Sequence, residues 1–181
     1  MVWIIVVILV LLILYVISTY NTLVGLKNKV KDGWSQIEVV LKRRADLIPN
    51  LVETVKGYAK HEEGTLTAVI EARNKAVSAT TPEEAMKAEG EVTQALSRLF
   101  ALTESYPELK ANQNFLDLQK SLEETENKIT YSRQFYNDNV LNYNNKTEMF
   151  PSNIVASIFR FEKFKFFEAS EKDRETPKVQ F

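Results

Sequence analysis

The residues best suited to bind a ligand form a short charged cluster just before a proline. In "KRRADLIPN", residues 42–50, three basic side chains and Asp46 interrupt an apolar series that continues on both sides at helical spacing. Pro49 removes one backbone hydrogen bond and crowds the preceding turn, so we expect the helix to kink or briefly break within residues 46–50. A break would expose backbone N–H groups, which could hold a carboxylate or a phosphate together with Arg43 and Arg44.

A plainer interpretation of this cluster is structural, and we favour it over the anion site. Lys42 and Arg43 would then be solvated, whereas Arg44 and Asp46 would form ion pairs with neighbouring helices. The apolar positions keep their helical phase across Pro49, which is typical of a bend in a packed helix.

The chain has few of the residues that catalysis and metal binding use most often. It has no cysteine and a single histidine, His61, so zinc sites, thiol nucleophiles and Ser-His pairs lack their usual members. Glu123, Glu124 and Glu126 could line a bundle interior, but di-metal carboxylate bundles also use a His three residues after a Glu, which this sequence lacks. No nucleophile adjoins a base, and there is no glycine-rich phosphate loop. We therefore predict a protein that is not an enzyme and that binds no cofactor and no metal.

Length and charge restrict the class of protein further. The 181 residues can form one domain with a substantial core, and the 23 basic residues balance the 24 acidic ones. A general nucleic-acid binder would show a basic excess, so we predict no nucleic-acid partner. With only five glycines and five prolines, the composition favours helices.

Residues 2–17, "VWIIVVILVLLILYVI", are apolar throughout and could cross a membrane as a helix. About 20 such residues span the hydrocarbon of a bilayer. A cleaved signal peptide is the alternative, but the sequence lacks basic residues before the run and a small-residue cleavage site after it. We predict a transmembrane anchor over residues 1–23. Lys27, Lys29 and Lys31 all follow the span, so we expect the N-terminus outside and the remaining domain in the cytoplasm.

Beyond the span, apolar residues recur in steps of three and four, which predicts helices. One such face runs from Val30 through Trp34, Ile37 and Leu41 as far as Val69. We interpret it as one long helix over residues 21–78, kinked at Pro49 and continuous with the transmembrane helix, because no Gly/Pro-rich linker separates them.

Further helices follow this long one. Thr81 as the cap and Pro82 as the first residue predict a second helix that ends near "SYPEL", where Pro107 stops it or begins the next element. A third periodic run covers residues 115–143, a loop is expected over residues 144–153, and a short helix starts at Pro151. Short loops place consecutive helices against each other in opposite directions, so residues 24–150 are predicted to form an all-α antiparallel helical bundle.

Residues 151–181 change in character after the short helix. In "IFRFEKFKFFEAS", residues 158–170, phenylalanines alternate irregularly with basic residues. They would pack as a strap on the bundle or, alternatively, meet lipid headgroups. The preceding asparagines at positions 137, 139, 142, 144 and 145 are poor helix formers. We expect some of them to bond across helices and fix register, and others to mark fraying before the 144–153 loop. Together with Asn112, Gln113 and Asn114 they could line a polar groove.

Two long motifs resemble the LemA family of bacterial proteins. They are "YNTLVGLKNKVKDGWSQIEVVLKRRADLIPNLVETVKGYAKHEEGTLTAVIEAR" and "YPELKANQNFLDLQKSLEETENKITYSRQFYNDNVLNYN", followed by "FP" and an aromatic stretch. The resemblance covers the chain from about residue 20 to its end. It implies an up-and-down four-helix bundle with one N-terminal anchor in the bacterial cytoplasmic membrane, and a family whose biochemical role is essentially undefined.

These observations together predict a non-catalytic, membrane-anchored scaffold or adaptor. Trp34, Ile37 and Leu41 emerge directly after the bilayer, where antiparallel partner helices need not reach, so we expect this face to mediate self-association. Other membrane proteins are possible partners. The alternative is a module that senses an anionic small molecule or a lipid headgroup, through the charged cluster or the aromatic tail.

Overall fold

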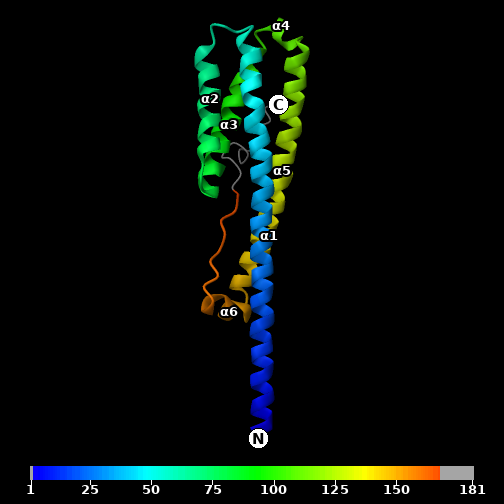
Figure 1. The fold of residues 1–181 in the computed structure, drawn as a ribbon, viewed down its shortest axis with the longest axis vertical. Helices are drawn as coiled ribbons and strands as arrows, with labels where there is room; N and C mark the ends of the chain where they lie inside the picture. Colours follow the sequence, from blue (N-terminus) through cyan, green and yellow to red (C-terminus); the bar gives the residue numbers. More distant parts are fainter. Residues whose placement is uncertain (1, 168–181) are drawn as a thin grey trace, which may run out of the picture. The chain divides into compact units, whose positions relative to one another are not determined.

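The computed structural model describes residues 2–167, and every regular element in that range is an α-helix (Figure 1). In chain order the helices are α1 (Val2–Lys56), α2 (Glu63–Ser78), α3 (Pro82–Thr103), α4 (Pro107–Lys110), α5 (Gln113–Glu148) and α6 (Ser152–Ile158). The prediction of an all-α protein with a long, apolar N-terminal helix is confirmed.

The described residues pack as two compact units. We call residues 2–36 together with 132–167 the anchor unit, because they include the apolar N-terminal segment, and residues 37–131 the core unit. Helices α1 and α5 contribute residues to both. Domain boundaries after residues 23 and 150 stay a prediction, and the end of the predicted tail, residues 168–181, lies outside the described residues.

Helix α1 contains 55 residues and passes Pro49 without interruption. It ends at Lys56, and the chain turns through residues 57–62 before α2 begins. A break within residues 46–50, one of the two outcomes expected of Pro49, therefore does not occur, and the expected continuous helix to residue 78 is wrong. Gly57 follows the observed end, in keeping with the weak helix propensity of glycine.

Helix α3 begins as its capping residues predict. The Thr81 hydroxyl accepts the Glu84 N–H at 3.2 Å, and the Glu84 carboxylate accepts the Thr81 N–H at 3.3 Å. Hydrogen bonds from Thr80, above all from its backbone N–H, lower the pKa of Glu84. The carboxylate is therefore charged at neutral pH and lies at the helix end that favours an anion. Pro107 begins α4, one of the two roles expected of it.

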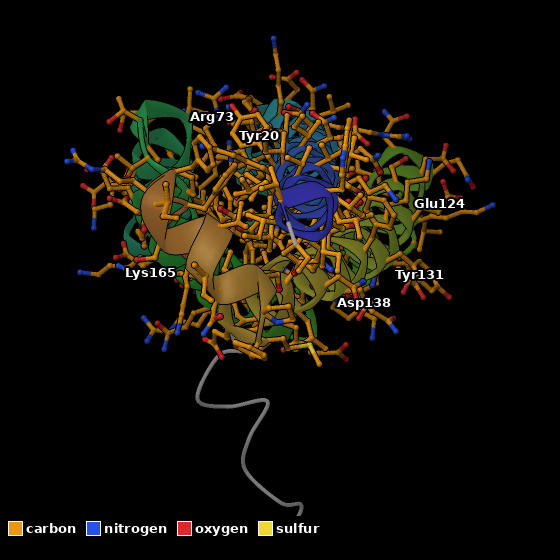
Figure 2. All side chains as sticks on the ribbon, turned by 90° about the horizontal axis from the view of Figure 1, so that it is seen from below. Tyr20, Arg73, Glu124, Tyr131, Asp138 and Lys165 are labelled. Atoms are coloured by element: carbon orange, nitrogen blue, oxygen red, sulfur yellow. The ribbon has the colours of Figure 1, made fainter. Side chains whose placement is uncertain are left out.

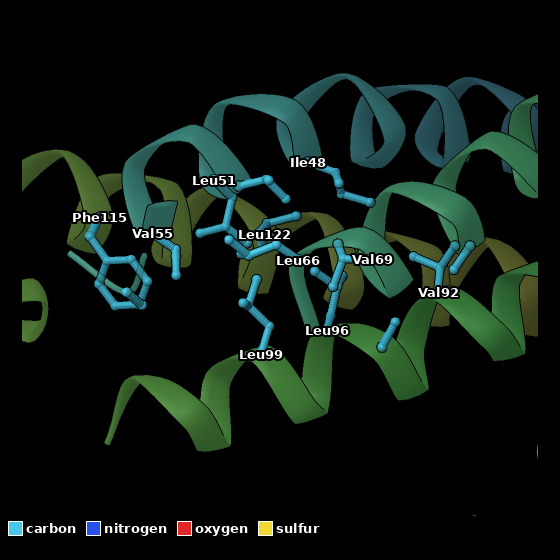
Figure 3. Packing of buried hydrophobic residues seen from close by; sticks show 14 of the residues in the cluster. Ile48, Leu51, Val55, Leu66, Val69, Val92, Leu96, Leu99, Phe115 and Leu122 are labelled. Carbon is cyan, nitrogen blue, oxygen red and sulfur yellow. The ribbon is translucent and has the colours of Figure 1, made fainter. Parts of the chain in front are cut away.

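The core unit is organised around one apolar core, to which its helices all contribute (Figure 3). Its buried members include Ile48, Leu51 and Val55 from α1, Leu66 and Val69 from α2, Val92, Leu96 and Leu99 from α3, and Phe115 and Leu122 from α5. Each aliphatic side chain that is fully buried contributes about 1.5–3 kcal/mol relative to exposure, so this core is the main stabilising feature of the unit. Helices α2 and α3 lie side by side in it (Figure 1).

Helix α5 buries a side chain at every seventh position along its length. These residues are Phe115, Leu122, Ile129, Tyr136 and Tyr143. A seven-residue repeat keeps one seam of a helix turned to the same side over many turns. Glu124, Tyr131 and Asp138, also seven apart, are exposed on the outward side (Figure 2). The helix continues to Glu148, so the predicted loop over residues 144–153 is wrong in its first half.

In the anchor unit, α6 packs on α1 and the chain then extends without regular structure to residue 167. Val155 and Ala156 of α6 form a small buried cluster with Leu23 of α1. Helix α6 lies where a short helix was predicted. Helices α1 and α5 also approach closely in this unit, because a Cβ at Gly33 would lie only 3.3 Å from the Tyr136 Cα.

Candidate functional site

Arg44 is the charged residue of the 42–46 cluster that the fold buries, with 2% of its surface exposed. Its Nη1 atom lies 3.2 Å from Glu89 Oε2 and 2.9 Å from Glu126 Oε2. Its Nη2 atom donates to the Thr93 hydroxyl at 2.8 Å. The guanidinium thus joins α1, α3 and α5, and the favoured interpretation of Arg44 as an ion-pair residue is confirmed.

The other charged residues of the cluster do not join this network. Lys42 and Arg43 are exposed, as the favoured interpretation predicts. Asp46 is exposed too, and none of the ion pairs found within residues 2–167 includes it, so the predicted ion pair of Asp46 is wrong. Because α1 is unbroken here, its backbone N–H groups remain within the helical hydrogen-bonding pattern. The geometry therefore does not favour an anion site at Pro49, and an interaction role for Arg43 and Asp46 stays a prediction.

A side chain from α2 compensates for the hydrogen bond that Pro49 cannot make. A residue at position 49 with an N–H would bond the Ala45 carbonyl, four residues earlier. Instead, Arg73 Nε donates to that carbonyl at 3.1 Å. Arg73 therefore both satisfies the carbonyl and ties α2 to α1, which explains how the helix passes the proline.

We expect Arg73→Met to lower the free energy of unfolding by about 1–2 kcal/mol. In a Pro49→Ala background the restored N–H can bond the Ala45 carbonyl, so the same substitution should cost about 1 kcal/mol less. Circular dichroism of urea unfolding in detergent measures both losses for the full-length chain. Arg98→Met, at an exposed position of α3, is the matched control. Equal losses from Arg73→Met in the two backgrounds would contradict the coupling.

An open groove of about 670 Å³ lies beside Pro49 in the core unit. Val52, Leu66 and Ile70 form part of its apolar lining, and Lys56 is among the charged residues at its sides. Among the described residues, no group of three or more His, Cys, Asp or Glu side chains could hold a metal ion. The groove therefore offers apolar contacts with a mixed-charge border rather than a reactive centre.

The face predicted to mediate self-association is largely covered by the chain itself. Ile37 and Leu41 are buried. Trp34 is half-buried, with its ring 5.7 Å from that of Tyr136 and 6.4 Å from that of Phe167. The premise that this face lacks cover is therefore wrong, since two of its three residues are buried and Tyr136 of α5 and Phe167 of the extended tail pack against the third, Trp34. A partner-binding role for these three residues stays a prediction.

Two asparagines of α5 hold the extended segment 161–167, which we call the strap, by its backbone. Asn137 donates its side-chain N–H to the Phe167 carbonyl at 2.9 Å and accepts the Phe167 N–H at 2.7 Å. Asn144 makes the same pair of bonds with Phe164, at 2.9 and 3.1 Å. Each amide thus pairs with both backbone groups of one strap residue. The asparagines bond to the strap and not, as expected, across helices.

Two tyrosines beside these asparagines bond the strap as well. Tyr136 and Tyr143 donate their hydroxyls to the carbonyls of Lys165 and Glu162, at 3.0 and 2.9 Å. Burial, followed by the negative charge of Glu162, raises the pKa of Tyr143, so its hydroxyl remains a donor at neutral pH. We call these four residues of α5 the Tyr-Asn clamp.

The spacing of the clamp matches the geometry of a helix beside an extended chain. Seven residues of α5 rise about 10.5 Å, and three extended residues cover about 10 Å. The strap therefore meets the second Tyr-Asn pair three residues away from the first, and it runs antiparallel to α5. The aromatic residues at 161, 164 and 167 follow this three-residue step, and their rings contact those of Tyr20, Tyr143 and Trp34.

The strap was one of two interpretations of the tail, and its packing on helices is confirmed for residues 161–167. The clamp itself was missed, although two signals were present. "YN" occurs at residues 136–137 and again at 143–144, and phenylalanines recur with a period of three. The seven-residue period is that of an ordinary helix seam, and the three-residue period is that of neither a helix face nor a strand, so neither indicated that the two segments contact each other.

The fold and these sites define an all-helical protein whose N-terminal helix is long and apolar enough to cross a membrane. Its exposed apolar segment is consistent with a single-pass membrane protein. A model of the LemA family matches residues 33–181, and the chain belongs to this family.

Several relatives share moderate identity with the chain. Protein LemA of Metamycoplasma hominis is 28% identical over 158 residues, which cover 85% of this chain and 71% of the relative. The magnetosome proteins MamQ 1 and MamQ 2 of Paramagnetospirillum magneticum are each 27% identical over 175 residues, covering 82% of this chain. The match covers 64% of each MamQ protein, slightly less than two thirds of its length.

Proposed function

We propose that this protein is a non-catalytic scaffold or adaptor anchored in the bacterial cytoplasmic membrane. The observation behind the proposal is the continuity of α1. One helix begins in the exposed apolar segment at Val2 and continues to Val55, a buried residue of the core. No Gly- or Ser-rich linker separates the apolar segment from the residues of α1 that pack in the core.

The soluble part of this scaffold is an antiparallel up-and-down four-helix bundle of α1, α2, α3 and α5. Two features support this arrangement. The four helices share one apolar core, and the connections between α1 and α2 (residues 57–62) and between α2 and α3 (residues 79–81) are short. Short connections favour antiparallel neighbours.

Copies of the chain associate in the plane of the membrane, and other membrane proteins are further partners. The Trp34 face is covered internally, so the apolar segment of α1 is the better surface for this contact. Its side chains from Val2 to Leu14 are 44–82% exposed in the folded chain. Helices in lipid associate by close packing of such surfaces.

One variant tests both the orientation and the association. Ser105→Cys adds a single thiol at an exposed position between α3 and α4 of a chain without cysteine. Lys27, Lys29 and Lys31 favour a cytoplasmic bundle, so a membrane-impermeant maleimide should label this thiol only after the cells are opened. Photobleaching of the labelled protein in native membranes should then show two or more steps per spot.

The results separate the two claims. Ready labelling in intact cells would reverse the orientation and leave the association untouched. Single bleaching steps at full labelling would remove the self-association. The alternative function, recognition of an anionic small molecule or a lipid headgroup, would then become the better account, since Lys27 of α1 and Arg133 of α5 lie over the Phe161 and Phe167 rings of the strap.

A further inference from the structure

The connection between α5 and α6, helix α6 itself and the turn after it leave apolar side chains uncovered in the anchor unit. Five large side chains have exposed fractions of 47–80%: Met149, Phe150, Ile154, Ile158 and Phe159. Residues 149–159, "MFPSNIVASIF", contain no charged side chain. We call these five residues the α6 surface. Large apolar side chains exposed together along one short segment point to a contact surface.

A different face of α6 already packs within the protein. Ser152, Val155 and Ala156 are buried, and the last two contact the α1 residues Val16 and Leu23. Residues three or four apart share one side of a helix. Ile154 and Ile158, four apart, therefore lie together on a side that α1 does not cover.

Helix α6 is fixed beside the residues at which the apolar segment of α1 ends. The Tyr20 ring lies 4.8 Å from the Phe159 ring and 5.6 Å from the Phe161 ring. The unbroken apolar run of α1 ends at Ile17, and its first charged side chain is Lys27. The α6 surface thus lies next to the point at which α1 would leave the hydrocarbon of a bilayer.

We infer that the α6 surface is embedded in the interface of the membrane and that lipid covers it. The inference rests on the proposed function, in which α1 crosses the bilayer. Aromatic rings such as Phe150 and Phe159 suit the headgroup level, where apolar helix faces also insert. Basic groups follow immediately, at Arg160 and at Lys27, whose Nζ lies 5.8 Å from the Phe161 ring. They complement the anionic headgroups of the cytoplasmic leaflet.

Lipid explains the surface better than a second copy of the chain does. The surface adjoins the end of the apolar segment of α1 directly, at Tyr20, and basic groups lie beside it at Lys27 and Arg160. A second attachment point beside the span also has a mechanical consequence. It fixes the depth of α1 and restricts its tilt, which a single helix in lipid leaves open.

Single nitroxide labels test this inference in the full-length chain, which has no native cysteine. Phe150→Cys and Ile158→Cys report on the α6 surface, and Ile13→Cys reports on the span. Phe135→Cys is the matched control, an exposed apolar residue of the same unit. Its ring lies 3.5 Å from the Cβ position of Gly33, about 20 Å beyond Tyr20 along α1 at 1.5 Å per residue.

The labelled chains are placed in vesicles of phosphatidylcholine and phosphatidylglycerol. Power-saturation EPR compares collisions with oxygen, which concentrates in lipid, and with a nickel chelate, which stays in water. We expect the oxygen-to-nickel ratio at residues 150 and 158 to exceed that at residue 135 several-fold and to approach that at residue 13.

Each other outcome overturns the inference in a distinguishable way. If the oxygen-to-nickel ratios at residues 150 and 158 equal the ratio at residue 135 while residue 13 lies in lipid, the anchor remains and the α6 surface lies in water. If the label at residue 13 is as accessible to the nickel chelate as the label at residue 135, α1 does not cross the bilayer, and both the proposed anchor and this inference are wrong. Shielding of residues 150 and 158 from both reagents, with spin-spin broadening, would show that a second copy covers the surface.

Discussion

Replacing Arg44 with alanine should lower the free energy of unfolding by about 3–5 kcal/mol, the largest loss we expect from a single substitution in this chain. The Glu89 carboxylate, whose side chain is 3% exposed, would lose the guanidinium that lies 3.2 Å away. Glu126 would lose the same partner, but it is 41% exposed and can be hydrated. The cost therefore arises mainly from Glu89, a buried charge that water cannot reach.

Three companion variants show whether this reason is correct. Arg43→Ala removes an exposed neighbour and should change the stability by no more than about 0.5 kcal/mol. Arg44→Lys keeps the charge but not the planar fork that reaches two carboxylates and a hydroxyl, so it should be intermediate. Arg44→Met with Glu89→Met should recover much of the loss, because no charge is then left buried.

Chemical unfolding of the full-length variants in detergent, followed by circular dichroism, measures these differences. A loss below about 1 kcal/mol for Arg44→Ala would contradict a role for the pair in stability. Equal losses for Arg44→Ala and the double Met variant would instead attribute the effect to lost packing. The stem of the arginine would then matter more than its charge.

The parts of the fold that the sequence predicts correctly depend on neighbours along the chain. Thr81 and Pro82 determine the start of α3 by bonds and ring geometry within one turn. The apolar segment of α1 needs only its length and composition to be identified as a candidate span. Both features were therefore predictable without knowledge of any tertiary contact.

Both a bend and a break at Pro49 were open from the sequence, with the bend favoured, because the outcome depends on a distant residue. A proline inside a helix leaves one carbonyl without its usual donor, and from the sequence alone a break is a reasonable outcome. The structure supplies the donor from Arg73, on the next helix. Helix α1 ends at Lys56 instead, and the next residue, Gly57, is a weak helix former.

The Trp34 face was misjudged for a related reason. Its apolar residues were identified correctly, but Trp34 packs against Tyr136 of α5 and Phe167 of the strap, and the strap has no helical or strand-like spacing of its own. A strap of period three becomes recognisable only when it is set beside a helix with a period of seven. That helix is α5, which carries the Tyr-Asn clamp. The clamp residues precede the strap residues that they hold by more than 15 positions.

Asn137→Ala combined with Asn144→Ala should release the strap from α5 while the helices remain folded. The two substitutions remove four hydrogen bonds to the backbone of Phe164 and Phe167. Each bond contributes about 1 kcal/mol to holding the strap on α5. The summed loss is well above about 1.4 kcal/mol, the loss of local stability that makes opening ten times more frequent. Hydrogen–deuterium exchange of the strap should therefore become at least about tenfold faster. Asn142→Ala with Asn145→Ala is the matched control, because both residues are exposed on the same helix.

The backbone pairing also predicts which changes the strap tolerates. The asparagines bond backbone N–H and C=O groups, and every residue except proline has both. Phe166→Ala, at an exposed position, should therefore leave the hydrogen exchange of Phe164 and Phe167 unchanged. Phe167→Pro should have the opposite effect, since proline has no N–H to donate to Asn137. If instead the double asparagine variant exchanges like the control while Phe164→Ala and Phe167→Ala exchange faster, the aromatic contacts with Tyr143 and Trp34 hold the strap. The clamp would then only determine its register.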